Sequence, residues 1–289
     1  MKRVVRNGIS FQYMVPAALL VLATEIIPVF YTTYLGFYSW DLITPKKWVA
    51  FNNYFKVFTS PELLNAMKNT AFWVVGTLIL AVALPLAMAM LINTTRAKTV
   101  FKTIFFIPST LSPTIAAIFW KRALSSQQGA LVPILAMVGI VVPPILTNPH
   151  TNTFVMIAIA AWQYFGLNLI LFLVGLETIP PEPREAAMID GANTFQTFFR
   201  IILPLLRPIT LLVVANAIIN TIRTFDIPWV VIQGGPGRVS ETLAVSLYRE
   251  SFLLFRVGLG SAIAVLLSVF TLAASWRYLT MMGKKAHAG

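Results

Sequence analysis

Two carboxylates flank a run of small side chains in a polar stretch of this otherwise apolar chain. In chain order the stretch carries Glu185, Ala186, Ala187, Asp190, Gly191, Leu203 and Pro204. Small side chains let another backbone approach closely, and carboxylates offer strong, charge-assisted hydrogen bonds to a basic partner. This spacing would suit the docking of a soluble partner, and the alternative is an interfacial amphipathic loop that packs on its own helix bundle.

Residues for other chemistry are scarce. The chain has no Cys, and His150 and His287 are far apart, which excludes a metal site with His and Cys spacing. No paired catalytic carboxylates fall in one apolar run and no Ser/His/Asp set occurs, so we do not expect an enzyme. No Gly-x4-Gly-Lys-Ser/Thr motif occurs either. If the protein pumps a solute, another chain must supply the energy.

The elements that position this stretch are membrane helices. Of 289 residues, 57% are hydrophobic and only 11% are charged, far below the quarter that soluble domains carry. The net charge of +12 is spread between apolar runs, which argues against nucleic-acid binding. We expect an all-α polytopic membrane protein with one permease domain over residues 1–289. Six runs are long enough to span a bilayer: Met14–Phe37, Thr70–Ile92, Phe101–Trp120, Phe154–Leu176, Ile209–Ile232 and Leu259–Thr280.

Two details of these runs matter. The fifth is interrupted by Arg223, Asp226 and Pro228. A seventh stretch, Leu131–Leu146, is shorter and carries three prolines, so we interpret it as an interfacial or re-entrant element.

Basic residues set the orientation. With the N-terminus inside, each of the four inner segments holds three basic residues, twelve of the 22 in the chain. These residues are Lys2, Arg3, Arg6, Arg96, Lys98, Lys102, Arg184, Arg200, Arg207, Arg277, Lys284 and Lys285. Both termini are therefore predicted to be cytoplasmic. The first run is too long for a signal peptide and lacks a small-x-small cleavage pattern, which favours an uncleaved helix.

Residues 178–207 are then a cytoplasmic loop, and their pattern predicts two short helices. The prolines after Ile179 end the fourth span, and Glu182-Pro183 suits a new helix start. Gly191 is a natural terminator in the left-handed conformation. Asn193 and Gln196 have capping-box spacing for a second helix, which should run towards Leu203 and stop near Pro204.

The motifs of this loop resemble the coupling loop of membrane subunits of binding-protein-dependent ABC importers. The flanks resemble the carbohydrate-permease branch of that family over nearly the whole chain. These flanking motifs are Asn52-Asn53-Tyr54, Asn69-Thr70, Trp162, Gly175-Leu176, Ile179-Pro180, Gly234-Gly235-Pro236, Thr242-Leu243 and Tyr248. There are departures: Ile232-Gln233 replaces a common Thr, and the long extra loop of the maltose-type subunit is absent.

The resemblance implies a location and a set of partners. It implies the cytoplasmic (inner) membrane of a prokaryote, two ATPase subunits, a second and distinct permease, and an external solute-binding protein. ATP and Mg²⁺ would be used by the ATPase, and this chain would need no cofactor. It also implies that Glu185, Ala186, Ala187, Asp190, Gly191, Leu203 and Pro204 couple the permease to the ATPase.

Polar side chains inside spans are costly and therefore indicate a solute path. Asn216, Asn220 and Arg223 fall on one helical face, followed by Thr224 and Asp226. Arg223 and Asp226 are three residues apart and could form an ion pair or gate. The alternative for the asparagines is hydrogen bonding between helices.

Two further spans supply candidates. Span four offers Gln163 and Asn168, which do not share a face, beside the aromatic Tyr164. Span six offers Ser261, although small residues there also favour close helix packing.

Glu25 lies in the middle of the first span with no cation near it in sequence. It must be protonated or face a protein interior, such as the partner permease. The leading function is an ATP-driven importer of a sugar or oligosaccharide that works by alternating access. The alternatives are import of glycerol phosphate or another small polar solute, and a proton-coupled secondary carrier that uses Glu25.

Overall fold

The computed structural model describes residues 7–286 except 126–128, 130, 142 and 236, and side-chain burial between residues 13 and 276. The predicted inner-face residues Lys2, Arg3 and Arg6, the side chains of Arg277, Lys284 and Lys285, and the motif residue Pro236 lie outside the described part. Residue contacts group into two compact units, which are described separately. The first is built from residues 1–60 and 246–268, and the second from residues 61–245 and 269–289.

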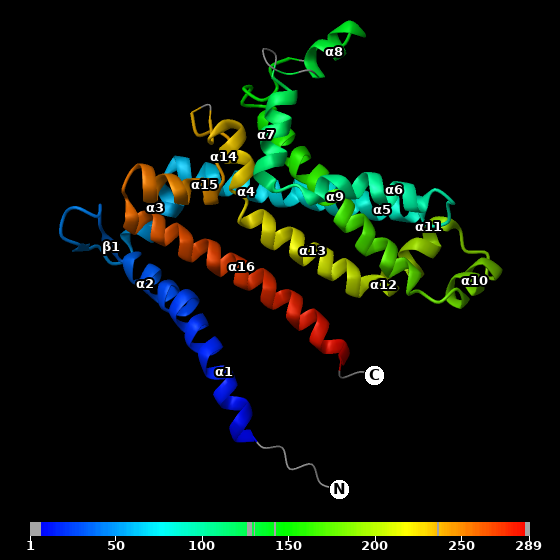
Figure 1. Ribbon diagram of the computed structural model, residues 1–289, viewed down its shortest axis with the longest axis horizontal. Coiled ribbons are helices and arrows are strands. Elements are labelled where there is room, and N and C mark those ends of the chain that lie inside the picture. The colour runs from blue at the N-terminus through cyan, green and yellow to red at the C-terminus, as the bar shows by residue number, and fades with distance from the viewer. Residues whose placement is uncertain (1–6, 126–128, 130, 142, 236, 287–289) are drawn as a thin grey trace. The chain divides into compact units, whose positions relative to one another are not determined.

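The first unit joins the start of the chain to the start of its last helix (Figure 1). Its elements are α1 (Asn7–Val21), a π-helical segment (Leu22–Ile26), α2 (Ile27–Leu35), β1 (Tyr38–Ser39), β2 (Lys47–Trp48), α3 (Asn52–Thr59), a π-helical segment (Arg249–Leu253) and the first part of α16 (Val257–Ala286). The two short strands pair antiparallel, with Tyr38 opposite Trp48.

Asn53 holds the first unit together at the end of α2. It is buried, and its Nδ2 donates to the carbonyls of Gly36 and Tyr38, both at 2.9 Å. A Cβ on Gly258 would overlap the Tyr38 carbonyl, so only glycine fits where α16 meets this turn. The motif Asn52-Asn53-Tyr54 thus has a structural role here.

The second unit contains the remaining helices. They are α4 (Pro61–Thr77), a π-helical segment (Leu78–Ala83), α5 (Leu84–Ile92), α6 (Lys98–Phe106), a 3₁₀ turn (Ile107–Thr110), α7 (Pro113–Ala123), α8 (Leu131–Met137), α9 (Asn152–Glu177), α10 (Glu182–Ile189), α11 (Thr194–Thr197), a π-helical segment (Phe198–Ile202), α12 (Leu203–Leu205), α13 (Arg207–Ile222), α14 (Asp226–Ile232) and α15 (Leu243–Tyr248), which continues into the first unit. The predicted all-α class is confirmed, since β1 and β2 are the only strands in the described residues.

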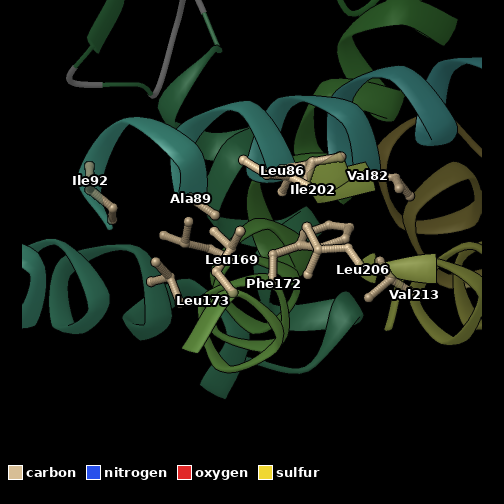
Figure 2. Close-up of a cluster of buried hydrophobic side chains, with 11 residues drawn as sticks. Val82, Leu86, Ala89, Ile92, Leu169, Phe172, Leu173, Ile202, Leu206 and Val213 are labelled. Carbon is tan, nitrogen blue, oxygen red and sulfur yellow. The ribbon is translucent and has the colours of Figure 1, made fainter. Parts of the chain in front are cut away.

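Helix α9 is the core of the second unit. Leu169, Phe172 and Leu173 are fully buried against α5, α12 and α13, in a cluster that includes Leu206 and Val213 (Figure 2). Nearer the start of α9, a second cluster joins it to α4, α7 and α14. A hydrophobic helix packed on most sides is expected for the centre of a bundle.

The six predicted runs all fall on helical segments. Four helices are long and apolar enough to span a membrane: Tyr13–Leu35, Pro61–Ile92, Asn152–Glu177 and Val257–Trp276. Two bent pairs overlap the others: Lys98–Thr110 with Pro113–Ala123 overlaps the third run, and Thr194–Leu205 with Arg207–Ile222 overlaps the fifth run through its second helix. In the described residues of the seventh stretch the only helix is α8, which is too short to span; an interfacial or re-entrant placement stays a prediction.

The fifth predicted run, Ile209–Ile232, is broken at the interruption that Arg223, Asp226 and Pro228 indicate in the sequence. Helix α13 ends at Ile222, and α14 begins at Asp226. Pro228 has no N–H to bond the Thr224 carbonyl, as a continuous helix would require. That carbonyl instead accepts a hydrogen bond from Thr242 Oγ1 at 3.0 Å.

The third predicted span, Phe101–Trp120, is also broken, with a 98° bend between its two halves. Ser112 stops the first half because its side chain caps α7 by accepting from the Ile115 N–H at 3.3 Å. Pro113 then takes the first helical position, where its missing donor costs nothing.

Gly166 sets how closely α6 approaches α9. A Cβ at this position would overlap the Phe105 carbonyl. We expect Gly166→Leu to destabilise the second unit by about 1–3 kcal/mol, the usual range for overpacking. Thermal unfolding of the detergent-purified protein should show a lower Tm. Ala158→Leu, at an exposed position of the same helix, is the control and should leave the Tm unchanged. Equal Tm values for the two variants would contradict this packing role.

Candidate functional site

The predicted helix–glycine–helix loop is present at residues 182–205. Helix α10 ends in a left-handed glycine, Gly191, with φ of +76°. The Ala192 N–H donates to the Ala187 carbonyl at 2.9 Å and the Gly191 N–H to the Met188 carbonyl at 3.2 Å. This pair of bonds is a Schellman motif, which satisfies the last carbonyls of the helix.

The second half of the loop starts at a complete capping box. The Asn193 side chain accepts from the Gln196 N–H at 2.8 Å, and the Gln196 side chain accepts from the Asn193 N–H at 3.0 Å. The helical segments that follow end at Leu205, one residue past Pro204. The loop geometry therefore follows from local sequence signals alone.

The exposed face of the loop differs from the flat alanine surface that the sequence suggested. Glu185, Ala186 and Asp190 are exposed, but Ala187 is only 6% exposed because it faces the rest of the loop. Exposed apolar side chains form the prominent surface instead, with Ile189 at 87% and Phe195 at 71%. Exposed apolar groups beside charged ones mark a surface that binds a partner.

A charged cluster fixes the start of the loop, and the sequence reasoning missed it. Glu177, the last residue of α9, accepts from Lys98 Nζ at 2.5 Å and lies 3.6 Å from Lys102 Nζ. Lys98 also donates to Asn93 Oδ1 at 2.9 Å. The ends of α5 and α9 and the start of α6 are thus joined at one point, directly before the loop.

Two cavities, whose walls mix polar and apolar side chains, lie within the second unit. One of about 180 Å³ is lined by Trp73, Thr77, Pro113, Ala160, Tyr164, Asn220, Thr221, Arg223, Thr224, Asp226 and Ile227. One of about 280 Å³ is lined by Thr77, Ala81, Tyr164, Leu167, Asn168, Leu171, Asn216, Ala217, Asn220 and Thr221. They share Thr77, Tyr164, Asn220 and Thr221, so they form neighbouring parts of one polar region between α4, α9 and α13.

Most of the predicted path residues meet in this region. Asn168, Asn216, Asn220 and Thr224 all line it, joined by the aromatic face of Tyr164. Thr77 and Thr221 were missed, because a threonine in an apolar helix usually bonds its own backbone and gives no sequence signal. The spacing of the asparagines on one helix face was the informative signal.

Gln163 and Ser261 lie elsewhere. Gln163 Nε2 donates to the Leu111 carbonyl at 2.7 Å, at the break between α6 and α7. Ser261 is buried in the first unit and lines neither cavity. The close approach at Gly258 supports the packing role for the small residues of α16.

Arg223 and Asp226 do not pair as the sequence suggested. Both line the smaller cavity, yet among the described residues no ion pair joins them. The helix breaks at Arg223, with φ of −96° and ψ of 9°, so the i, i+3 geometry of a continuous helix is lost. Asp226 Oδ1 instead accepts from Thr114 Oγ1 at 3.0 Å.

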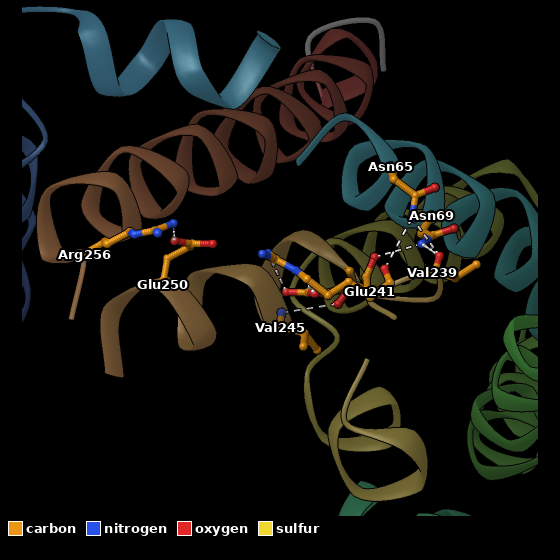
Figure 3. A network of polar contacts seen from close by, with 9 residues as sticks. Asn65, Asn69, Val239, Glu241, Val245, Glu250 and Arg256 are labelled. Atoms are coloured by element: carbon orange, nitrogen blue, oxygen red, sulfur yellow. Dashed lines mark hydrogen bonds and ion pairs between the residues drawn. The ribbon is translucent and has the colours of Figure 1, made fainter. Parts of the chain in front are cut away.

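The segment that follows α14 is anchored by buried polar groups (Figure 3). Asn69 donates to the carbonyls of Val239 and Glu241, at 2.6 and 2.9 Å. Glu241 is 1% exposed and its carboxylate lies 2.6 Å from Arg238 Nε. The Leu243 N–H donates to Thr70 Oγ1 at 3.0 Å. The motif residues Asn69 and Thr70 of α4 thus anchor the segment between α14 and α15.

Glu25 is exposed on the first span, Tyr13–Leu35, none of whose most apolar window is buried within this chain. It lies in the π-helical segment and no ion pair of the described residues includes it. This chain alone therefore does not shelter the carboxylate.

Comparisons with known proteins agree with this arrangement. Residues 81–279 match the family model described as "Binding-protein-dependent transport system inner membrane component". The arabinooligosaccharides transport system permease protein AraP of Bacillus subtilis (strain 168) is 33% identical over 251 residues, covering 85% of this chain and 80% of AraP. The osmoprotective compounds uptake permease protein GgtC of Synechocystis sp. is 33% identical over 261 residues, covering 88% and 92%.

A solved structure shares the fold. A chain of the bacterial alginate ABC transporter, solved in complex with an alginate pentasaccharide-bound periplasmic protein, superposes with a TM-score of 0.81 at 20% identity. The match covers 98% of this chain and 96% of that one. The chain belongs to the family of binding-protein-dependent transport system inner membrane components, and it is a membrane-spanning permease subunit of an ABC importer, not an enzyme.

Proposed function

We propose that this permease imports a sugar or oligosaccharide by alternating access. Two ATPase subunits would drive it with ATP and Mg²⁺, a second permease would complete the membrane part, and a solute-binding protein would deliver the solute from outside. AraP and the alginate transporter are named for saccharides, which supports this solute class. The termini would both be cytoplasmic, as the basic residues predict.

The observation that carries the solute class is the polar region of the second unit. The amide side chains of Asn216 and Asn220 and the ring of Tyr164 line it. Asn168 also borders it, but its Nδ2 donates to the Ala81 carbonyl at 2.5 Å. A neutral saccharide needs donors and acceptors without net charge, and aromatic faces for its apolar ring surfaces. This lining fits such a solute better than it fits an inorganic ion.

Arg223 favours a second candidate, an anionic solute such as a glycerol phosphate or an acidic saccharide. It is exposed to the smaller cavity, and no carboxylate of the described residues forms an ion pair with it. A guanidinium fits carboxylate and phosphate groups with two parallel hydrogen bonds. The charge of the transported solute separates the two candidates.

The coupling loop would transmit movement of the ATPase to the bundle. Its exposed side chains, Glu185, Met188, Ile189 and Phe195, would contact the ATPase, and Gly191 would keep the two short helices at a fixed angle. We propose that Asp190, Leu203 and Pro204 shape the loop, because they lie at helix ends. Closure of the ATPase dimer would then tilt α9 and α13 and open the path outward.

Removing an amide from the polar region should impair uptake without affecting assembly. Asn220 lines both cavities, so Asn220→Ala should lower uptake of labelled oligosaccharide by about 10-fold or more, since an unpaired polar group on the solute costs about 1–3 kcal/mol. Uptake is measured in cells, and co-purification of the partners checks assembly. Thr103→Ala, exposed on α6, is the control. Wild-type uptake of every saccharide tested would argue against this path.

Changing the loop turn should abolish transport without preventing insertion of the chain in the membrane. Gly191→Asp places a branched charge at a φ of +76°, which costs a non-glycine residue about 1 kcal/mol, and disturbs the docked face. We expect transport to be lost while the chain still inserts in the membrane. Gly139→Asp is a matched control, because Gly139 has a φ of +80° and equally open surroundings. Mass spectrometry of the purified complexes should find an ATPase, a second permease and a binding protein. Equal transport by both variants would refute the coupling role.

Glu25 has no transport role in this scheme. We propose that it faces polar groups of the second permease. Glu25→Gln keeps the hydrogen bonds but removes the titratable group, so ATP-dependent uptake should remain within about twofold of wild type. Uptake by reconstituted vesicles at several external pH values is the measurement. Loss of uptake with intact assembly and ATPase activity would favour a proton-linked role instead.

A further inference from the structure

A third cavity lies wholly within the first unit, apart from the proposed solute path. Its volume is about 560 Å³, larger than either of the two cavities of the proposed solute path. It is lined by Ser39, Trp40, Asp41, Thr44, Pro45, Lys47, Asn53, Lys56, Ser60, Phe255, Arg256, Gly258 and Leu259. The volume is in the range of small-molecule sites, roughly 300–1,000 Å³.

Three cations border this cavity. Lys47 and Lys56 are exposed, and no ion pair of the described residues includes either of them. Arg256 lies 3.4 Å from the buried Glu250 carboxylate, yet its side chain is 63% exposed (Figure 3). The positive charge of the two lysines is therefore available to a ligand.

The one carboxylate in the lining, that of Asp41, already accepts hydrogen bonds from the residues of its own turn. Asp41 Oδ1 accepts from the Ile43 and Thr44 N–H groups at 3.0 and 2.7 Å, and from Thr44 Oγ1 at 2.8 Å. These bonds hold the pKa of Asp41 below its ordinary value. The carboxylate caps its own turn and stays negative, and the cavity keeps an excess of positive charge because three basic side chains and only one carboxylate line it.

The position of the cavity in the chain places it at the edge of the membrane. The first span ends at Leu35, four residues before Ser39, and the last span begins at Val257, beside Gly258. The Val257 N–H donates to the Trp40 carbonyl at 3.0 Å, which brings the two span ends to the same level. Aromatic side chains at this level, including Trp40 and Trp48, are typical of a membrane–water interface.

Two features at the ends of these two spans favour the binding of an anion in the cavity. The start of α16 lines the cavity, and the N-terminal end of a long helix attracts negative charge. Exposed lysines close to a membrane surface attract an anionic headgroup by charge. The cavity is also larger than inorganic phosphate requires, which leaves room for the glycerol of a headgroup.

We propose that this cavity binds the phosphate headgroup of an anionic phospholipid, held by Lys47, Lys56 and Arg256. The lipid occupies the leaflet that faces the loop between the first two spans, which the basic residues predict to be the outer one. Its role is to fix the start of α16 against the turn after α2. The proposal does not depend on the transported solute.

Retention of phosphatidylglycerol by the purified complex tests this site. The complex, with its partners, is extracted in mild detergent, washed and supplied with phosphatidylglycerol or phosphatidylcholine. Bound lipid is counted by native mass spectrometry, and the Tm is recorded. The test variant is Lys47→Gln with Lys56→Gln, since no ion pair of the described residues includes either lysine, whereas a change at Arg256 would also remove its contact with the buried Glu250 carboxylate. Lys68→Gln, an exposed lysine outside the cavity, is the matched control.

We expect wild type and Lys68→Gln to retain phosphatidylglycerol in preference to phosphatidylcholine, and to gain Tm from it. The double variant should bind it roughly 25-fold more weakly, about fivefold for each lysine. Equal retention by the double variant, or no preference in wild type, would overturn the proposal. A third arm supplies inorganic phosphate alone. If phosphate raises the Tm as much as the lipid does and the lipid adds nothing, the site binds a free anion and the lipid proposal is wrong.

Discussion

Backbone groups at helix breaks inside a membrane must find partners within the protein, because the hydrocarbon offers none. Two of the spans of this chain are broken, and both breaks meet this constraint with side chains from elsewhere. Gln163 donates to the Leu111 carbonyl, and Thr242 donates to the Thr224 carbonyl. The same breaks carry Pro113, Arg223 and Asp226 into the wall of the polar cavity. The polar region therefore exists because the helices stop there, and the helices can stop there because α9 and the segment after α14 supply the missing partners.

Local signals in the sequence predicted what depends on local geometry. The capping box at Asn193, the left-handed Gly191 and the helix start at Glu182 follow directly from residue types and spacing. The six apolar runs and the all-α class follow from composition and length. The asparagines on one face of α13 were identified because a 3.6-residue period is visible in the sequence.

What the sequence did not predict depends on contacts between distant segments. Whether Gln163 lines a path or caps a break is decided by where Leu111 lies, 52 residues away. Arg223 and Asp226 have ion-pair spacing only if the helix continues between them, and Pro228 prevents that. Ala187 turned out to be buried and Ile189 exposed, because the face of α10 that packs inward depends on α11. Glu177 gave no signal, since its partners Lys98 and Lys102 are on another helix.

The Schellman motif and the capping box have a mechanical consequence. The turn between α10 and α11 is held by hydrogen bonds at four consecutive or nearby residues, Gly191, Ala192, Asn193 and Gln196. These bonds restrict the backbone, so the turn cannot easily change its conformation when one of the helices is displaced. If the loop couples the permease to an ATPase as proposed, a displacement at Ile189 would reach α12 and α13 with little change in the angle between the two short helices. A loop of the same length without these bonds would bend and would transmit less of that displacement.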